Sequence, residues 1–231
     1  IVIGAEEGAV PTNESMNAVL KEIGVPGAVS SSVNKMSSRI LGDLDSKRSF
    51  TDIIKSGFQG EERFNYDHSY MTGVVSCLIA GASDWRSPQV NEKLVTASIF
   101  HDLSLEGTNS MARDGVGRPK VGSNEDSELD LDHAKKMAIQ LKSSDDIPSD
   151  VIKIIEFHHQ ENNPSLSPIV CAFIVAHSFV LELYESQFDP EEIPGVLEKL
   201  ENHFKEENYL KQVEVLKEQI PNLKSNGLPV A

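Results

Sequence analysis

Five successive helix-like segments, each carrying at least one histidine, constrain this chain more than any other feature of its sequence. Apolar residues recur at the three-to-four-residue spacing of amphipathic helices, and no convincing series of segments alternates apolar and polar residues as half-buried strands do. We therefore predict an all-α fold in which these segments pack as a helical bundle. The histidines in the five segments are His68, His101, His133, His158, His159 and His177.

Local signals indicate where several of the helices begin and end. Ser49 and Ser149 are placed to cap the helices that follow them, and Pro88 stands near the start of another. Pro221 is expected to end the last helical region. A glycine-rich segment over 107–126 is the longest predicted loop. The predicted helices cover residues 13–27, 30–44, 49–58, 66–82, 87–103, 127–142, 147–161, 166–185 and 189–220, the last as one or two helices.

Charge and cysteine usage narrow the class of protein. A formal net charge of −15 argues against electrostatic binding to a nucleic-acid polymer or to an anionic membrane. The most apolar segment, 166–185, contains a histidine and is flanked by acids, so we predict a core helix and not a membrane span. Cys77 and Cys171 lie in apolar helical stretches and are expected to be buried free thiols, which fits a cytoplasmic protein. The first residues lack the basic start of a signal peptide.

Each histidine taken alone has a purely structural explanation. His177 lies on an apolar helical stripe, where a lone histidine is more often a hydrogen-bonded core residue, and His133 can form a surface pair with Asp132. Taken together they indicate a shared metal site, because imidazole is the commonest transition-metal ligand and facing helices direct side chains into one pocket. His203 lies among acids in the polar C-terminal region and is expected to be solvated.

Asp102 directly follows His101 and is the carboxylate placed to bridge two ions. Two metal ions about 3.5–4 Å apart can hold both sides of a phosphodiester, and a carboxylate can offer one oxygen to each ion. Metal-bound water is acidified to a pKa near 7, which supplies a nucleophile without a separate base. Asp102 is therefore our candidate catalytic residue.

The order H…HD…H…HH resembles the signature of the HD-domain metal-dependent phosphohydrolases, and the histidine doublet resembles the HD-GYP branch. The segments "YDHSYMTGVVSCLIAG", "KLVTASIFHDLSL" and "VIKIIEFHHQENNPSLSP" are similar to successive motifs of that family, and the resemblance covers about residues 50–185. It implies an HD-type helical domain over residues 50–225. Residues 1–49 would then be an N-terminal extension of linker helices, the end of an upstream sensory or receiver domain, or a segment that forms a homodimer.

The resemblance also implies a dinuclear centre bridged by Asp102. His68, His101 and His177 would complete the sphere of one divalent transition metal, and His133, His158 and His159 that of the other. The implied substrate is a cyclic dinucleotide, above all cyclic di-GMP, or another small phosphodiester. Arg118 and Lys120, in the glycine-rich loop, are placed to neutralise the phosphates of a substrate, or are solvated loop charges.

Several positions depart from the branch pattern. Gln160 stands where the branch has a glutamate, and Leu166-Ser167-Pro168 stands at the Gly-Tyr-Pro triplet. The stretch Leu103-Ser104-Leu105 lacks the glycine and the polar group that follow the HD pair. His177 stands where the family places an aspartate ligand, which leaves one carboxylate among six imidazoles. Such a ligand set suits iron or manganese, and also zinc, nickel or cobalt, better than magnesium or calcium.

These departures leave other functions open. The first alternative is a catalytically impaired signalling or binding module that retains the metal site. The second is a nucleotide phosphohydrolase of another HD branch, where a histidine doublet is less expected. With His177 in place of the aspartate, the ion on that side can also be bound weakly or not at all, so that the centre holds a single ion.

Overall fold

The computed structural model describes residues 20–22, 27–44, 46, 48–57, 64–103, 126–144 and 146–226. These residues form helices and turns with no strand among them, which confirms the predicted all-α bundle. The described helices are α2 (Gly27–Leu44), α3 (Phe50–Gly57), α4 (Phe64–Gly81), α5 (Pro88–Phe100), α6 (Asp126–Leu141), α7 (Ser149–Phe157), α8 (Pro168–Glu185), η3 (Pro190–Glu192), α9 (Ile193–His203) and α10 (Glu207–Asn226).

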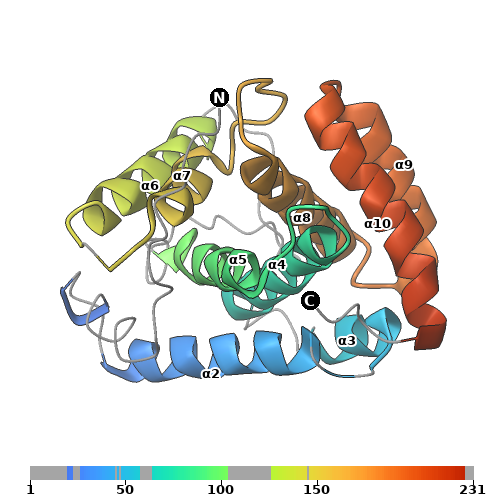
Figure 1. Cartoon of the computed structure of the whole chain (residues 1–231), viewed down its shortest axis with the longest axis horizontal. Helices are drawn as coiled ribbons and strands as arrows, with labels where there is room; N and C mark the ends of the chain where they lie inside the picture. The colour runs from blue at the N-terminus through green and yellow to red at the C-terminus, as the bar shows by residue number, and fades with distance from the viewer. Residues whose placement is uncertain are drawn as a thin grey trace.

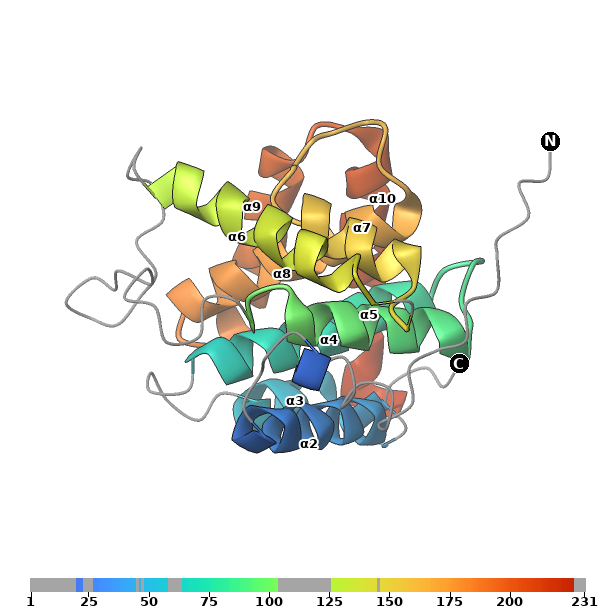
Figure 2. The ribbon, with the colours of Figure 1, turned by 90° about the vertical axis from the view of Figure 1, so that its left-hand side faces the viewer.

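Helices α4, α5 and α8 form the centre of the bundle, and the other helices surround them (Figure 1). Helices α2 and α3 lie along one side, α6 and α7 cover a second, and α9 and α10 cover a third. In the orthogonal view, α5 lies between α2 and the α6–α7 pair (Figure 2). Helices α4, α6 and α8, each of which carries a candidate histidine, and the ends of α5 and α7 therefore converge on one region of the interior.

Helix α8 is a core helix that neighbours cover on all sides, as the sequence predicted. Its residues from Val170 to Val180 are all buried. Among the described residues it is the one helix long and apolar enough to cross a membrane, yet 72% of that stretch is buried inside the bundle. A helix that is apolar all round is expected in the centre of a helical protein.

Close contact between α4 and its neighbours depends on Gly73. A Cβ atom at this position would lie 2.6 Å from Oγ of Ser98 on α5 and 2.8 Å from Cδ1 of Ile40 on α2. Any larger residue would push these two helices away from α4. Gly73 thus lets α4, which carries His68, pack tightly against α5, which leads into His101 and Asp102.

A partly buried polar cluster also ties α2 to α4. The hydroxyl of Tyr70 donates to Oδ2 of Asp43 at 2.5 Å, and Nη1 of Arg48 donates to Oδ1 of the same carboxylate at 2.7 Å. The guanidinium of Arg39 lies 4.1 Å above the Tyr70 ring. Helix α2 therefore packs as part of the core, with Ile40 fully buried. An upstream domain before it stays a prediction.

The observed helix ends agree with some of the predicted start and stop residues and differ from others. Ser49 accepts a hydrogen bond from N of Asp52 at 3.1 Å, and Pro88 occupies the first turn of α5, as predicted. The cap assigned to Ser149 is wrong: α7 begins at Ser149 itself, and the preceding Pro148 makes no side-chain cap. The stop assigned to Pro221 is also wrong, because α10 continues to Asn226. A proline removes one backbone hydrogen bond, which a helix already held by packing can tolerate.

Candidate metal centre

The structure brings all seven histidine and aspartate residues of the predicted site together. They come from five helices: His68 from the first turns of α4, His101 and Asp102 from the end of α5, and His133 from α6. The doublet follows the end of α7, and His177 lies in the middle of α8. Six of the seven side chains are buried, and His159 is partly exposed. The seven are His68, His101, Asp102, His133, His158, His159 and His177.

Two helix ends use the same device to aim a histidine ring at the centre. His101 is the C-cap of α5, and its Nδ1 lies 2.9 Å from the carbonyl oxygen of Ser98. His158 is the C-cap of α7, and its Nδ1 lies 2.7 Å from the carbonyl oxygen of Ile155. A carbonyl accepts, so Nδ1 carries the proton and Nε2 keeps its lone pair. This is the tautomer and orientation in which a protein histidine binds a metal ion.

The carboxylate of Asp102 divides its two oxygens between two sets of histidines. Its Oδ2 lies 3.2 Å from Nε2 of His101 and 3.6 Å from Nε2 of His68. Its Oδ1 lies 3.2 Å from Nε2 of His133 and 3.8 Å from Nε2 of His158. This is the arrangement that a carboxylate bridging two ions requires.

Two overlapping groups of ligand atoms result, and within each group all atoms lie within 4.8 Å of one another. Ligands about 2.1 Å from a metal ion lie about 3.0–3.4 Å apart when adjacent and about 4.2 Å apart when opposite, so each group is only slightly wider than a single coordination sphere requires. We call them the first set and the second set, and both include Asp102. The first set adds His68, His101 and His177, and the second adds His133, His158 and His159. These are the same two sets that the HD resemblance implies; binding of an ion by each set stays a prediction.

Burial keeps four of the imidazoles neutral. It lowers the pKa of His68 to about 3 and that of His159 to about 4, although the charge of Asp102 opposes both shifts. Burial also holds the pKa values of His158 and His177 well below their usual range, and neighbouring imidazoles add to this effect. Neutral imidazole is the form that binds metal, so these four side chains are ready to bind at neutral pH without losing a proton.

Asp102 is charged in spite of its burial. Burial alone would raise the pKa of its carboxyl, but electrostatic interaction with the neighbouring His101 imidazole and hydrogen bonding with His101 and His133 hold the pKa well below its usual range. The cluster therefore presents one carboxylate surrounded by imidazole nitrogen donors. Such a set binds a divalent cation with nitrogen preference far better than it binds calcium or magnesium.

An unsatisfied nitrogen supports the metal interpretation over a purely structural one. Nε2 of His158 is buried, points toward Asp102 and has no hydrogen-bond partner among the described residues. A buried polar atom without a partner costs about 1–3 kcal/mol. A hydrogen-bonded core histidine would not leave its lone pair in this state, whereas a metal ligand needs that lone pair. The residues present thus fit a metal centre.

Other predicted residues have different outcomes. Arg118 and Lys120 lie outside the described residues, so their role as phosphate contacts stays a prediction. Gln160 belongs to neither ligand set and accepts a hydrogen bond at 3.3 Å from the side chain of Asn163. His203 is not simply solvated: its side chain is 50% exposed, and Nε2 lies 2.5 Å from a carboxylate oxygen of Glu161.

The two cysteines are buried free thiols, as predicted. Burial raises the pKa of Cys171 to about 11. Both thiols are absent from the two ligand sets. They therefore act as small apolar core residues and not as metal ligands.

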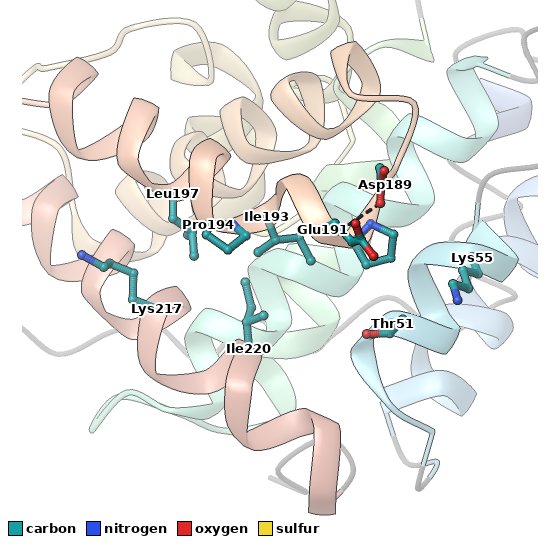
Figure 3. Close-up of a pocket in the computed structure, with 10 residues that line it drawn as sticks. Thr51, Lys55, Asp189, Glu191, Ile193, Pro194, Leu197, Lys217 and Ile220 are labelled. Atoms are coloured by element: carbon teal, nitrogen blue, oxygen red, sulfur yellow. Dashed lines mark hydrogen bonds between the residues drawn. The ribbon is translucent and has the colours of Figure 1, made fainter.

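A separate cavity of about 840 Å³ lies between α3, the η3–α9 segment and α10 (Figure 3). Apolar side chains such as Ile193, Pro194 and Ile220 form its walls, with Lys55 and Thr51 at its α3 side. Lys217 also borders it but is paired with Glu201 at 2.5 Å. No member of the two ligand sets lines this cavity, so it is separate from the candidate metal centre.

Comparisons with known protein families, with curated proteins and with solved structures found no match for this chain. The resemblance to HD domains therefore rests on the order of the motifs, and membership of that family stays a prediction. The geometry of the cluster does not depend on that resemblance, because its distances are those between residues of this chain.

Proposed function

We propose that this chain is a metal-dependent phosphodiesterase that hydrolyses a cyclic dinucleotide, with cyclic di-GMP as the first substrate to test. One observation carries the proposal: the two oxygens of Asp102 face two separate sets of histidine nitrogens. Two divalent ions held in this way would supply Lewis-acid chemistry to a phosphodiester and acidify a water molecule. Iron or manganese is the expected metal, and the nitrogen-rich ligands also suit zinc, nickel or cobalt.

The chain's own residues account for binding and orientation. Asp102 holds both halves of the centre together, and the Nδ1 bonds of His101 and His158 fix their rings. Burial of His68 and His177 keeps the first set away from bulk water. The partly exposed His159 places the second set nearer to the surface, so we assign the approach of the substrate to that side.

A single carboxylate has a consequence for the ligand. Two divalent ions carry four positive charges, and Asp102 is the one anionic member of the two sets. The loaded centre would therefore attract anions strongly, although the chain as a whole carries a net charge of −15. A compact phosphodiester that reaches the centre gains this local attraction, whereas a long nucleic acid also meets the repulsion of the surface.

A binding or signalling module is the second candidate. Gln160 favours this candidate, because it places an amide and not a carboxylate next to the doublet. Its amide oxygen accepts a hydrogen bond from the side chain of Asn163. In that case the centre would bind the dinucleotide, or stabilise the bundle, without turnover.

The decisive experiment measures hydrolysis of cyclic di-GMP by the protein purified without chelator, with added Mn²⁺ or Fe²⁺. Asp102→Ala is the test variant, and Asp84→Ala, which removes an exposed carboxylate outside the cluster, is the matched control. We expect hydrolysis by the unchanged protein and by the control, and none by Asp102→Ala. Tight dinucleotide binding without hydrolysis would instead support the module. Less than one transition metal per chain would refute both.

A further inference from the structure

The His158–His159 doublet lies beyond the last turn of α7, so the helix alone does not hold it. His158 is fixed by its own bond to the carbonyl of Ile155. Nε2 of His159 lies 3.4 Å from Nε2 of His133, and the His159 ring also lies near those of His158 and His177, which are themselves candidate ligands. Residues 160–167, which we call the doublet loop, contain turns and no helix. The position of His159 therefore depends on how the doublet loop is anchored.

Tyr209, on α10, anchors the start of the doublet loop. Its hydroxyl lies 3.1 Å from the carbonyl oxygen of Gln160, to which it donates, and accepts from N of Asn163 at 3.2 Å. The Tyr209 side chain is fully buried, and its ring stacks on Phe204 with centroids 5.1 Å apart and planes 12° apart. A rigid hydroxyl thus contacts the backbone of the residue that directly follows His159.

A second contact joins the doublet loop to the turn between α9 and α10. Asn162 has φ of 56°, in the left-handed region that asparagine tolerates better than most residues. Its Oδ1 accepts a hydrogen bond from N of Lys205 at 2.7 Å. Beside it, Glu161 contacts His203 at 2.5 Å. The loop is therefore fastened to a part of the bundle that contributes no ligand to either set.

We propose that Tyr209 is a positioning residue for the second set: its hydroxyl fixes the backbone after the doublet and so fixes the direction of the His159 ring. The inference rests on the proposed metal centre. The histidines of the first set come from α4, the end of α5 and α8, and none belongs to the doublet loop. Helix α8 meets the loop through Ser178, which donates to Glu161 at 3.0 Å, whereas the hydroxyl of Tyr209 bonds the loop at Gln160 and Asn163. Affinity for one ion should therefore depend on Tyr209, and affinity for the other should not.

The test is Tyr209→Phe, which keeps the ring and its stacking and removes only the hydroxyl. Co²⁺ is titrated into metal-free protein, with its absorption reporting coordination and a chromophoric chelator as competitor. The change is made in two backgrounds: His177→Ala, which weakens the first set, and His159→Ala, which weakens the second. Loss of a group that orients metal ligands costs about 10–100-fold in affinity. We expect about a tenfold loss in the His177→Ala background and no measurable change in the His159→Ala background.

Tyr70→Phe is the matched control, because it removes another fully buried phenol hydroxyl, which bonds Asp43 on α2 and makes no contact with the doublet loop in the described hydrogen bonds. It should lower the free energy of unfolding without weakening Co²⁺ binding by the second set. An equal loss in both backgrounds, or the same loss with Tyr70→Phe, would overturn the proposal in favour of a general stability effect.

Two further results separate this inference from the proposed function. If His177→Ala or His159→Ala does not fold, Tyr209→Phe is measured in the otherwise unchanged protein. It should weaken one of the two successive Co²⁺ affinities and leave the other unchanged. A change in neither affinity or in both overturns the inference. Fewer than two Co²⁺ ions per unchanged chain also overturns it. Two bound ions without hydrolysis of cyclic di-GMP would refute the proposed function alone, and the affinity comparison would still decide the role of Tyr209.

Discussion

The metal-free protein should lose stability steeply as the pH falls below about 6.5, because four of its histidines are buried in the neutral form. An unfolded histidine has a pKa near 6.5, whereas burial lowers that of His68 to about 3 and that of His159 to about 4. Below pH about 6.5 the unfolded chain binds more protons than the folded chain, so protonation favours unfolding. The stability is fully present above pH about 6.5 and is lost as the pH falls toward the folded pKa values.

The expected size of the loss follows from these values. At pH about 5, an unfolded histidine lies about 1.5 units below its pKa, while His68 and His159 remain mostly neutral in the folded protein. One unit corresponds to about 1.4 kcal/mol, so each of the two side chains contributes a loss of about 2 kcal/mol, or about 4 kcal/mol together. The lowered pKa values of His158 and His177 act in the same direction. A domain with a total stability of about 5–15 kcal/mol would be close to unfolding.

Urea unfolding followed by circular dichroism, in the presence of chelator, measures this loss at pH about 7.5, 6 and 5. His159→Gln should reduce the slope of stability against pH, because it removes one buried neutral imidazole. His203→Gln, at a half-exposed position outside the cluster, is the control for removing a histidine. A metal-free protein equally stable at pH about 7.5 and 5 would refute the buried neutral cluster.

Three further predictions concern the centre and the packing around it. Asp102→Asn should leave less than one metal ion per chain by elemental analysis, because a neutral amide cannot bridge two cations; retention of two ions contradicts the bridging role. Chelation should lower the free energy of unfolding by about 2.7 kcal/mol per site when free metal is 100-fold above its Kd, measured by urea unfolding; no change means that the centre is not loaded. Gly73→Val should lower the free energy of unfolding by about 1–3 kcal/mol in urea unfolding, because the new side chain would contact Ser98 and Ile40. Gly42→Val is the control, because its added Cβ has no atom within 4 Å and should not show this overpacking cost. Equal losses in the two variants would place the cause in helix propensity.

Much of the helical framework could be predicted because its signals are local. The cap at Ser49 and the proline at the start of α5 act on backbone groups a few residues away. Pro221 shows the limit of such signals. Its effect on a helix depends on whether packing elsewhere along α10 outweighs one missing hydrogen bond, and that packing involves distant residues such as Val213 and Leu216 in the core.

The anchors around the candidate site could not be predicted in the same way. Tyr209 contacts Gln160 across 49 residues of sequence, and nothing near either residue indicates the pair. The Nδ1 bonds of His101 and His158 go to backbone carbonyls, which every residue carries, so they leave no mark in the composition. Glu161 and His203, 42 residues apart, pair only because the doublet loop meets the α9–α10 turn.

The sequence by itself determined the helical class and the identity of the candidate ligands. Periodicity and side-chain chemistry depend on residue type and short-range spacing, and these are fully present in the chain. Only the tertiary structure decided that Asp102 turns one oxygen toward His68 and His101 and the other toward His133 and His158. That division depends on where α5 ends relative to three other helices. Packing of distant segments sets it, because a carboxylate has no preference between its two oxygens until the bundle closes around it.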